Sequence, residues 1–403
     1  MQTRKVMKIL IAGGGYGGLK TAITLQKRNP NAQITLISKH DYHYQTTLLH
    51  KIAVGTLSER KAKIYYRQLL TKVCFIKDKV MELCPEQNKV VGKLGEYSYD
   101  ILVIALGFKP DDFGIKGVKE HAYKLSSLNA SLRLCKHIER KFKDYHITKD
   151  KNDLSFIVCG SGLTGVEFSA ELASDIPRLC QIYGISPADI KISCIGRSEN
   201  VLPVFPQSLK EKTEQKLHAL GVTLYNQTSV LECYADGVLV SHNEKEEKLY
   251  GNTILWSAGV KGNDSIEFYS KVQSQKGRLK VDAQLRSEDY ENIYVVGDCA
   301  IYAQKEVIYV PTAQLATQMG EYVGNLLADM LEGKKEHKDF RFINRGSVCS
   351  IGHLDGVGVV FGRKISGELS AFVKNSIENR WLFGIGGLKM VLKKGQFRYR
   401  SSD

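Results

Sequence analysis

The sequence of 403 residues contains no two cysteines close together and no C-x-x-C motif. Its nine cysteines are scattered along the chain, at positions 74, 84, 135, 159, 180, 194, 233, 299 and 349. An odd and unpatterned set of this kind indicates reduced thiols and a cytoplasmic setting.

Long apolar runs are missing as well. No window of about eighteen consecutive apolar residues occurs, so we expect no membrane-spanning helix. The apolar segment near the N-terminus has the length of a strand and is not interpreted as a secretory signal. A hydrophobic content of 43% is that of a globular protein, and 403 residues allow two or three domains.

Acidic residues are too few to balance the basic ones, which number 57 against 43 and give a formal net charge of +14. This excess fits nucleic acid, an anionic membrane surface or an anionic cofactor. Because the chain lacks the stacking-aromatic pattern of a nucleic-acid-binding fold, we expect no nucleic-acid partner.

A glycine-rich stretch near the N-terminus is the strongest signal that is present. Residues 9–12 form a short apolar run typical of a buried parallel strand, and Leu19–Leu25 has helical character. Between them, Gly13, Gly15 and Gly18 have G-x-G-x-x-G spacing. Such glycines allow a tight turn, close approach of the backbone to a pyrophosphate, and close helix–strand packing. The stretch predicts a dinucleotide site at a helix N-terminus, with a purely structural glycine turn as the alternative.

The same spacing returns at Gly160, Gly162 and Gly165, after the apolar strand Leu154–Val158 and before the helical Val166–Ala173. Two fingerprints of this kind are much more specific than one. They predict two dinucleotide sites and therefore an α/β protein with two Rossmann-like domains.

The second strand of the first unit, Gln33–Ser38, does not end in the acidic residue that often binds the adenosine ribose. Ser38 still offers a hydroxyl, and Lys39 is suited to an adenine or a phosphate. A plain strand end with a solvated lysine is the alternative.

The second strand of the second unit, Lys191–Ile195, is followed by Gly196, Arg197 and Ser198. Without a carboxylate, nothing repels a 2′-phosphate, and an arginine can pair with that phosphate through two hydrogen bonds. These residues predict use of NADPH, unless Arg197 is only a surface charge.

Two helical segments carry polar residues of interest. Gln314 and Gln318 lie four residues apart on one face, which suits hydrogen bonding to an acceptor with carbonyl groups, although ordinary surface polarity is the alternative. Glu167 is either a favourable acid in a first helical turn or a residue that faces nicotinamide and flavin in a two-nucleotide flavoprotein.

The stretch Ala371–Arg400 combines apolar bulk with seven basic residues and one acid, Glu378. Its basic residues are Lys374, Arg380, Lys389, Lys393, Lys394, Arg398 and Arg400. Three glycines, Gly384, Gly386 and Gly387, are expected to break it into two short helices. Apolar bulk with a basic rim is typical of a helix in an anionic membrane interface, and a buried dimer helix is the alternative.

Together these features resemble the type II NADH dehydrogenases, which are single-chain NAD(P)H:quinone oxidoreductases attached to one membrane face. The resemblance covers nearly the whole chain and rests on Gly13–Gly18, 41–44, Gly160–Gly165 with Val166 and Glu167, 256–260, Gly297 with Asp298, Ala313, Gln314, Gln318, 348–350 and the basic tail.

The resemblance implies FAD bound without a covalent bond in the first unit and a nicotinamide nucleotide in the second. It further implies a membrane quinone such as menaquinone on the opposite face of the flavin, without proton pumping. A homodimer attached peripherally to the cytoplasmic face of the cell membrane is also expected. NADH-specific members of the family carry an acid where this chain has Gly196, so we expect NADPH, or both nucleotides, to be used.

The expected domains are an FAD-binding domain of residues 1–114 and 267–332, an NAD(P)H-binding domain of residues 115–266, and a dimer and membrane region of residues 333–403. The expected FAD contacts are Gly13, Gly15, Tyr16, Gly17, Gly18, Ser38, Lys39, Thr47, Val80, Ala105, Gly107, Asp298 and Ala313. The expected NAD(P)H contacts are Gly160, Gly162, Leu163, Thr164, Gly165, Gly196, Arg197, Ser198, Ala258 and Gly259. Glu167, Gln314 and Gln318 are the expected catalytic residues, and no metal site is expected.

Three other interpretations stay open. A disulfide reductase on the same fold would need two cysteines close together beside the flavin. A sulfide:quinone reductase would use Cys159 and Cys349, but Cys159 lies directly against the second fingerprint. A flavin-bound redox sensor or interaction protein would bind the same cofactors without rapid turnover of quinone.

Overall fold

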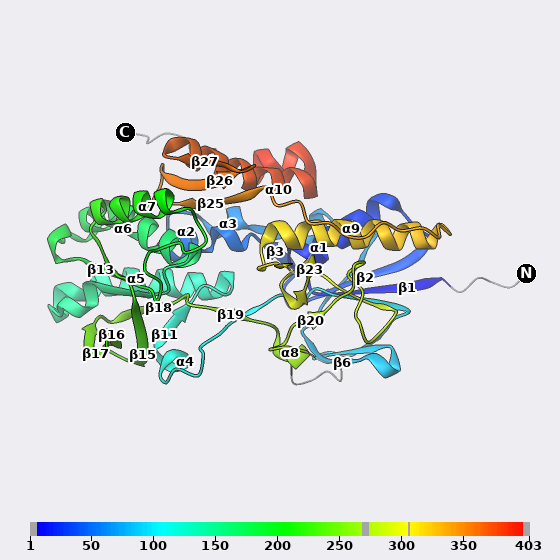
Figure 1. Ribbon diagram of the computed structural model, residues 1–403, viewed down its shortest axis with the longest axis horizontal. Helices are drawn as coiled ribbons and strands as arrows, with labels where there is room; N and C mark the ends of the chain where they lie inside the picture. Colours follow the sequence, from blue (N-terminus) through cyan, green and yellow to red (C-terminus); the bar gives the residue numbers. More distant parts are fainter. Residues whose placement is uncertain (1–5, 268–273, 305–306, 398–403) are drawn as a thin grey trace, which may run out of the picture. The chain divides into compact units, whose positions relative to one another are not determined.

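The computed structural model describes residues 6–267, 274–304 and 307–397 (Figure 1). Within it the chain forms two compact units. The first comprises Met1–Tyr44, Lys63–Lys109 and Val260–Asn344, and the second comprises Gln45–Ala62, Pro110–Gly259 and Arg345–Asp403. The chain therefore passes between the units several times. The three-part functional division expected from the sequence remains a prediction.

The first unit is built on a five-stranded sheet in the order β21-β9-β1-β2-β5. Its strands are β1 (Met7–Ala12), β2 (Ala32–Ser38), β5 (Cys74–Lys77), β9 (Ile101–Ile104) and β21 (Ile293–Val295). All neighbouring strands pair in parallel. The four residues of β9 and the last four of β1 are buried, which explains the continuous apolar runs in the sequence.

Helix α1 (Tyr16–Arg28) follows β1 and packs against α9 (Ala313–Leu331) (Figure 1). The two helices come so close that a Cβ on Gly320 would lie 2.2 Å from the carbonyl oxygen of Gly17. Helix α9 begins at a Thr312 cap, whose hydroxyl accepts a hydrogen bond from the Leu315 N–H. This packing fixes the start of α1 over the edge of the sheet.

Smaller elements complete the first unit. Residues 74–84 contribute to two sheets, because β5 ends at Lys77 and Val80 begins a separate antiparallel sheet. The remaining elements are β3 (Tyr42–Tyr44), β4 (Lys63–Tyr65), β6 (Val80–Cys84), β7 (Lys89–Gly92), β8 (Glu96–Ser98), α8 (Asp264–Glu267), β20 (Leu279–Lys280), β22 (Ala300–Ile301), β23 (Ala303–Gln304) and β24 (Val307–Ile308). At the changeovers between units lie β10 (Lys109–Pro110) and β19 (Val260–Lys261).

The second unit repeats the plan with a parallel sheet in the order β11-β18-β12-β13-β14. Its strands are β11 (Ala122–Lys124), β12 (Ser155–Cys159), β13 (Lys191–Ile195), β14 (Val222–Tyr225) and β18 (Thr253–Trp256). An antiparallel sheet of β15 (Thr228–Tyr234), β16 (Gly237–His242) and β17 (Lys245–Tyr250) is attached. The predicted α/β class with two Rossmann-like units is confirmed.

The helices of the second unit are α2 (Leu49–Val54), α3 (Glu59–Ala62), α4 (Val118–His121), α5 (Leu128–Thr148), α6 (Leu163–Tyr183) and α7 (Gln207–Ala219). Helix α5 buries one face. Leu134, Ile138 and Phe142 of that face belong to the main core with Phe156 of β12. Their spacing of four residues places them on one side of the helix.

The C-terminal part packs within the second unit. It consists of the antiparallel strands β25 (Gly346–Ser350), β26 (Gly356–Val360) and β27 (Arg363–Ser366), followed by α10 (Glu368–Lys394). Helix α10 lies on β25 and β26 and is broken at Gly387, where φ is 65°. Two helical stretches are therefore present as predicted, but the break is at Gly387 alone. Arg398 and Arg400 lie outside the described residues.

Candidate active site

The first fingerprint forms a tight cradle at the end of β1. Gly13 has a φ of +112°, and a Cβ there would lie 2.2 Å from the carbonyl oxygen of Ala105. A Cβ on Gly18 would lie 2.0 Å from the Gly13 carbonyl oxygen, whereas one on Gly15 would meet no atom within 4 Å. The turn therefore requires glycine at two positions, and the backbone of Gly15 faces open space.

Helix α1 presents its backbone N–H groups toward this open space. Gly15 is the N-cap and has no side chain with which to satisfy them. The first turn, which contains Tyr16, Gly17 and Gly18, carries no acid. A helix start of this kind is suited to an anionic group such as a pyrophosphate.

A buried tyrosine and a buried histidine hold the turn in place. The Tyr66 hydroxyl donates a hydrogen bond of 2.7 Å to the Gly14 carbonyl, and His43 Nδ1 lies 3.2 Å from the same oxygen. Burial lowers the pKa of His43 to about 4, so the ring is neutral near pH 7 and donates through Nδ1. His43 lies in the segment 41–44 on which the family resemblance rests, whereas Tyr66 carries no recognisable signal in the sequence.

Several expected FAD contacts lie around the same sheet edge. Ser38 ends β2, and Lys39 follows it beside Lys79 and Lys109. Partial burial and these two neighbouring charges lower the pKa of Lys39. The carbonyl of Val80 accepts a hydrogen bond from Ser265 Oγ, so Val80 is fixed in position.

Asp298 is the acidic residue that the sequence predicts to contact FAD. It lies in a short turn, Gly297–Cys299, and is half-buried. Burial raises the pKa of Asp298 to about 6, because Arg278 offsets only part of the desolvation. The Arg278 guanidinium donates to the backbone oxygens of Asp298 and Ala300 at 3.0 and 2.9 Å. Within the described residues, no hydrogen bond reaches the Asp298 carboxylate, which leaves it able to accept from a polyol.

The other predicted members of the FAD site are distributed less simply. Ala105 lies directly under Gly13, Gly107 has a φ of +70° with open space around it, and Ala313 is the first residue of α9. Thr47 belongs to the second unit, where its hydroxyl donates to Glu378 at 2.8 Å. Its role toward FAD remains a prediction.

The second fingerprint has the same geometry as the first. Gly160 has a φ of +124° and touches the backbone of Ser257, and a Cβ on Gly165 would lie 1.8 Å from the Gly160 carbonyl oxygen. A Cβ on Gly162 would meet no atom within 4 Å. Helix α6 begins at Leu163 and Thr164, and its N-cap is Gly162. The second unit therefore offers a second open backbone at a helix start.

Arg197 lies at the end of β13 with an aromatic ring beneath it. Its guanidinium carbon is 5.6 Å from the centroid of the Phe113 ring, a cation–π distance. The same ring packs against Gly259, where a Cβ would lie 2.3 Å from Phe113 Cζ. The structure therefore brings together Arg197 and Gly259, which the sequence predicts, with Phe113, which it does not. Ser198 follows Arg197, and the exposed Ala258 precedes Gly259.

Glu167 is buried, and it lies in the second turn of α6 because the helix begins at Leu163. The interpretation as a first-turn acid is therefore wrong. Its Oε1 accepts hydrogen bonds from the backbone N–H and the hydroxyl of Ser350, at 3.1 and 3.2 Å. Lys374 Nζ is 2.9 Å from the same oxygen, and His50 Nδ1 is 3.7 Å from Oε2.

Glu167 and Lys374 shift each other's pKa. Burial by itself would raise the pKa of Glu167, but Lys374 and His50 hold it below its usual value. Burial would likewise lower the pKa of Lys374, but Glu167 and Glu378 raise it. Lys374 is thus part of an internal ion pair, and its assignment to the basic rim of the tail is wrong. A carboxylate and an ammonium in this setting can hold a proton at a defined place.

Gln314 and Gln318 share one face of α9, as the sequence predicts. The Gln318 amide is already occupied, because Nε2 donates to the Ile343 carbonyl and Oε1 accepts from the Ile343 N–H, both at 3.0 Å. Gln318 therefore positions the backbone of Ile343. A direct bond from Gln318 to a quinone would have to displace these contacts.

No disulfide joins the thiols of the described chain. All nine cysteines are free, and six of them, including Cys159 and Cys349, are buried. Burial raises the pKa of both thiols well above the usual value, which keeps them protonated and weakly nucleophilic. Neither the disulfide-reductase nor the sulfide:quinone-reductase interpretation gains support from this arrangement.

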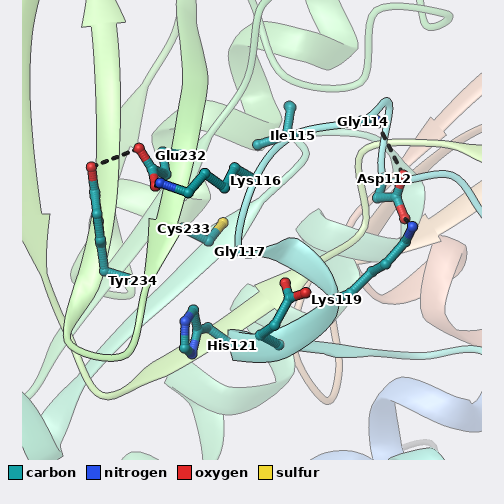
Figure 2. Close-up of a pocket in the computed structure, with 11 residues that line it drawn as sticks. Asp112, Gly114, Ile115, Lys116, Gly117, Lys119, His121, Glu232, Cys233 and Tyr234 are labelled. Carbon is teal, nitrogen blue, oxygen red and sulfur yellow. Dashed lines mark hydrogen bonds and ion pairs between the residues drawn. The ribbon is translucent and has the colours of Figure 1, made fainter.

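A surface cavity of about 510 Å³ lies elsewhere in the second unit, between the segment 112–121 and the end of β15 (Figure 2). Two ion pairs lie among its side chains: Lys116 contacts Glu232 at 2.7 Å, and Lys119 contacts Asp112 at 3.6 Å. Tyr234 also donates to Glu232 at 2.8 Å. None of the predicted site residues lines this cavity.

Comparison with known protein families is consistent with the two glycine-rich turns described above. Residues 7–320 match the family model described as pyridine nucleotide-disulphide oxidoreductase. That match covers both fingerprints and defines the class of protein to which the fold and the sites correspond.

Full-length relatives narrow the class. The type II NADH:quinone oxidoreductase of Staphylococcus saprophyticus is 39% identical over 404 aligned residues, which are 98% of this chain and 100% of that protein. The enzyme of the same name from Staphylococcus aureus has the same identity and coverage. The chain therefore belongs to the type II NADH:quinone oxidoreductase family.

Solved structures share the fold. The structure of NDH2 from Plasmodium falciparum in complex with NADH superposes with a TM-score of 0.87 at 21% identity, covering 97% of this chain and 98% of that one. The sulfide:quinone oxidoreductase of Aquifex aeolicus gives 0.77 at 19% identity, covering 94% and 92%. At these identities the likeness concerns the fold alone.

The Glu167–Lys374 pair generates a stability prediction. Lys374→Met leaves a buried carboxylate without its partner, so we expect a loss of about 3–5 kcal/mol in the free energy of unfolding near pH 8. In the variant the pKa of Glu167 is raised, so the loss is full above that pKa and shrinks as the pH falls through it. Urea unfolding at pH 8 and at pH 5 measures the difference.

Two further variants control this experiment. Lys389→Met removes an exposed lysine from the same helix and should change stability by less than about 0.5 kcal/mol. The double variant Glu167→Gln with Lys374→Met should recover most of the loss. An equal loss at both pH values and in the double variant would show that the ion pair is not the cause.

Proposed function

We propose that this protein is an FAD-dependent NAD(P)H:quinone oxidoreductase that passes electrons to a membrane quinone such as menaquinone without pumping protons. The observation that carries the proposal is the pair of open glycine cradles, one in each unit, in a chain 39% identical to type II NADH:quinone oxidoreductases over its full length. FAD, when bound, supplies the redox chemistry by accepting two electrons from a nicotinamide and passing them on.

The first unit fits FAD. The open backbone at Gly15 and the start of α1 suit the pyrophosphate. The turn that places them there requires glycine at positions 13 and 18, because a side chain at either position would clash with the backbone. Asp298 supplies a carboxylate for the ribityl hydroxyls, and Ser38 supplies a hydroxyl for the adenosine ribose. Lys39, with Lys79 and Lys109 nearby, makes this edge positive and favours an anionic cofactor.

The second unit fits a nicotinamide nucleotide, with Gly162 and the start of α6 at its pyrophosphate. Gly196 adds no carboxylate to the strand end, and Arg197 is presented over Phe113. An arginine–phosphate contact contributes about 1.5–3 kcal/mol, which is roughly ten- to a hundredfold in affinity. The name of the relatives refers to NADH, whereas Gly196 and Arg197 favour a nucleotide with a 2′-phosphate. We therefore infer that the protein uses both nucleotides, and NADPH at least as well as NADH.

On the quinone side, Gln314 is the residue we assign to a quinone carbonyl. Gln318 supports this place through its two hydrogen bonds to Ile343. Glu167 and Lys374 hold a buried proton and its counter-charge, and we assign them to proton supply. Each of these roles orients or protonates a bound partner and leaves the electron transfer to the cofactor.

The C-terminal helix is the proposed membrane contact. Phe383, Leu388 and Leu392 are exposed to 61%, 63% and 68%, while Trp381 and Leu382 on the same helix are buried. The exposed basic residues beside them are Arg380, Lys389 and Lys393. Every helix within the described ranges is too short or too polar to cross a bilayer. We propose that this face lies on an anionic membrane surface, on the cytoplasmic side, in a homodimeric protein.

The experiment that tests the proposal crosses NADH and NADPH with a soluble quinone. Purified protein should carry FAD absorbance, lose it when either nucleotide is added, and regain it rapidly when quinone follows. Bleaching without quinone-dependent recovery would favour a flavin-bound redox sensor. Protein that neither contains nor takes up FAD would contradict the proposal.

Substitutions in α9 should slow one half-reaction and leave the other unchanged. Gln314→Ala, alone or with Gln318→Ala, should slow quinone reduction about tenfold, the effect of one lost hydrogen bond. Reduction of the flavin by NAD(P)H should stay nearly unchanged in stopped-flow traces. Gln207→Ala, at an exposed glutamine of α7, is the matched control. If both half-reactions slow together, the assignment of Gln314 is wrong.

Cofactor choice should depend on one guanidinium. Arg197→Ala should raise the Michaelis constant for NADPH about ten- to a hundredfold and that for NADH only slightly. Arg133→Ala, at an exposed arginine on α5, should change neither. Wild-type protein that oxidises NADH well and NADPH barely would show that Arg197 is only a surface charge.

Membrane binding should depend on the exposed face of α10. Deleting the tail would also remove the buried Trp381 and Leu382, so point substitutions are the better test. Replacing Phe383, Leu388 and Leu392 by Ser should weaken sedimentation with anionic vesicles at least about tenfold, and salt should weaken wild-type binding.

The control places Ser at Ile147 and Val204, two exposed apolar residues outside α10, and should leave vesicle binding unchanged. Unchanged binding by the α10 variant, together with a halved mass in analytical ultracentrifugation, would identify this face as a dimer contact instead.

A further inference from the structure

The side chain of Ser161 fills the space beside Gly196, at the end of β13. Gly196 follows β13 and is buried, and a Cβ on it would lie 1.9 Å from Ser161 Oγ and 2.6 Å from Ser161 Cβ. Rotation of the Ser161 side chain would move its Oγ but not its Cβ. Any residue other than glycine at position 196 therefore needs the backbone of one of the two residues to shift.

Both backbones are held in place. The Gly196 N–H donates to the Tyr225 carbonyl and its own carbonyl accepts from Thr228, each at 2.9 Å. The Ser161 carbonyl accepts from the Leu202 N–H at 2.9 Å. A shift that made room for a side chain at 196 would break at least one of these bonds. The contact between Ser161 and Gly196 is therefore a fixed property of the second unit.

The first unit shows the reverse arrangement. Its Gly13 N–H donates to Ile37, just as Gly160 donates to Ile195, both at 2.8 Å. This correspondence makes Gly14 the counterpart of Ser161, and Ser38 the counterpart of Gly196. In the first unit the strand end carries the side chain and the fingerprint carries glycine. A Cβ on Gly14 would lie 3.2 Å from Ser38 Cβ and 2.0 Å from the Tyr66 hydroxyl.

We propose that Ser161 determines nucleotide specificity together with Gly196, because its side chain takes the place from which a strand-end carboxylate would reach the adenosine ribose. The inference rests on the proposed function, in which the second unit binds NAD(P)H. Ser161 leaves no room for an acidic side chain at position 196. No carboxylate therefore neutralises the charge of Arg197 when Arg197 contacts a 2′-phosphate. The Ser161 hydroxyl lies beside Gly196 and is a group that can bind a ribose or phosphate oxygen.

One consequence is that an acid at position 196 is insufficient to convert the site to NADH. Gly196→Glu places its Cβ on Ser161, whereas Ser161→Gly with Gly196→Glu recreates the arrangement of the first unit. The two substitutions should therefore be strongly non-additive, as expected for residues in direct contact.

The test is a double-mutant cycle on the FAD-loaded protein. Titration calorimetry with NAD⁺ and NADP⁺ gives the ratio of their dissociation constants for wild type, Ser161→Gly, Gly196→Glu and the double variant. The double variant should shift this ratio toward NAD⁺ by about a hundredfold or more, as expected when a charge-assisted contact is exchanged for a repulsion. Gly196→Glu alone should lose affinity for both nucleotides and melt at a lower temperature.

A second cycle protects the test against misfolding of Gly196→Glu. Gly196→Ala introduces only the Cβ, so it should lower the melting temperature in the presence of Ser161 and restore it with Ser161→Gly. Melting temperatures that fall equally in both backgrounds would overturn the steric coupling.

The outcomes also separate this inference from the proposed function. If wild-type protein binds neither nucleotide, the proposed function fails and the inference fails with it. If wild type binds them but the double variant keeps the wild-type ratio, or Gly196→Glu alone shifts it as far, only the inference fails.

Discussion

The structure depends on one hydrogen bond that occurs twice. In each unit the first glycine of the fingerprint donates its N–H, at 2.8 Å, to a carbonyl at the end of the neighbouring strand. The acceptor is Ile37, the last residue but one of β2, in the first unit and Ile195, the last residue of β13, in the second. This bond turns the chain sharply away from the sheet, so that the following helix starts at the sheet edge with its N–H groups toward open space. Because the turn needs positive φ and leaves no room for a Cβ, glycine is required there. The starts of α1 and α6 at the sheet edges, and the closeness of Ser38 and Gly196 to the two turns, follow from this bond.

A second constraint acts inside the second unit, where a carboxylate and an ammonium are buried together. Taking Glu167 and Lys374 out of water costs free energy that their contact and the Ser350 hydrogen bonds offset. The pair ties α6 to β25 and α10, which are far apart in the sequence. It also gives a buried place where a proton can be held, which a wholly apolar core would lack. A fold that needed only stability would be served as well by apolar side chains at these positions.

The sequence predicted what is local and periodic. The two fingerprints, the apolar strands of both sheets and the two Rossmann-like units follow from glycine spacing and short apolar runs, which are set within a few residues. Partners brought together from distant segments could not be predicted. Phe113 under Arg197 and Tyr66 on Gly14 are of this kind, because no pattern links residues so far apart in the chain. The sequence also predicts that Lys374 is a surface base, and this prediction is wrong, since charge alone does not reveal which side of a helix is buried.

The interleaving of the two units bears on how the chain is made. Strand β21 pairs with β9 in the first sheet, but it is synthesised only after the entire second sheet. During translation the edge of β9 stays unpaired while residues 110–259 of the second unit emerge. Neither unit is a continuous stretch of chain, so neither can be excised and produced as a simple fragment. A nascent chain of this design is exposed to edge pairing with its neighbours until β21 has been synthesised.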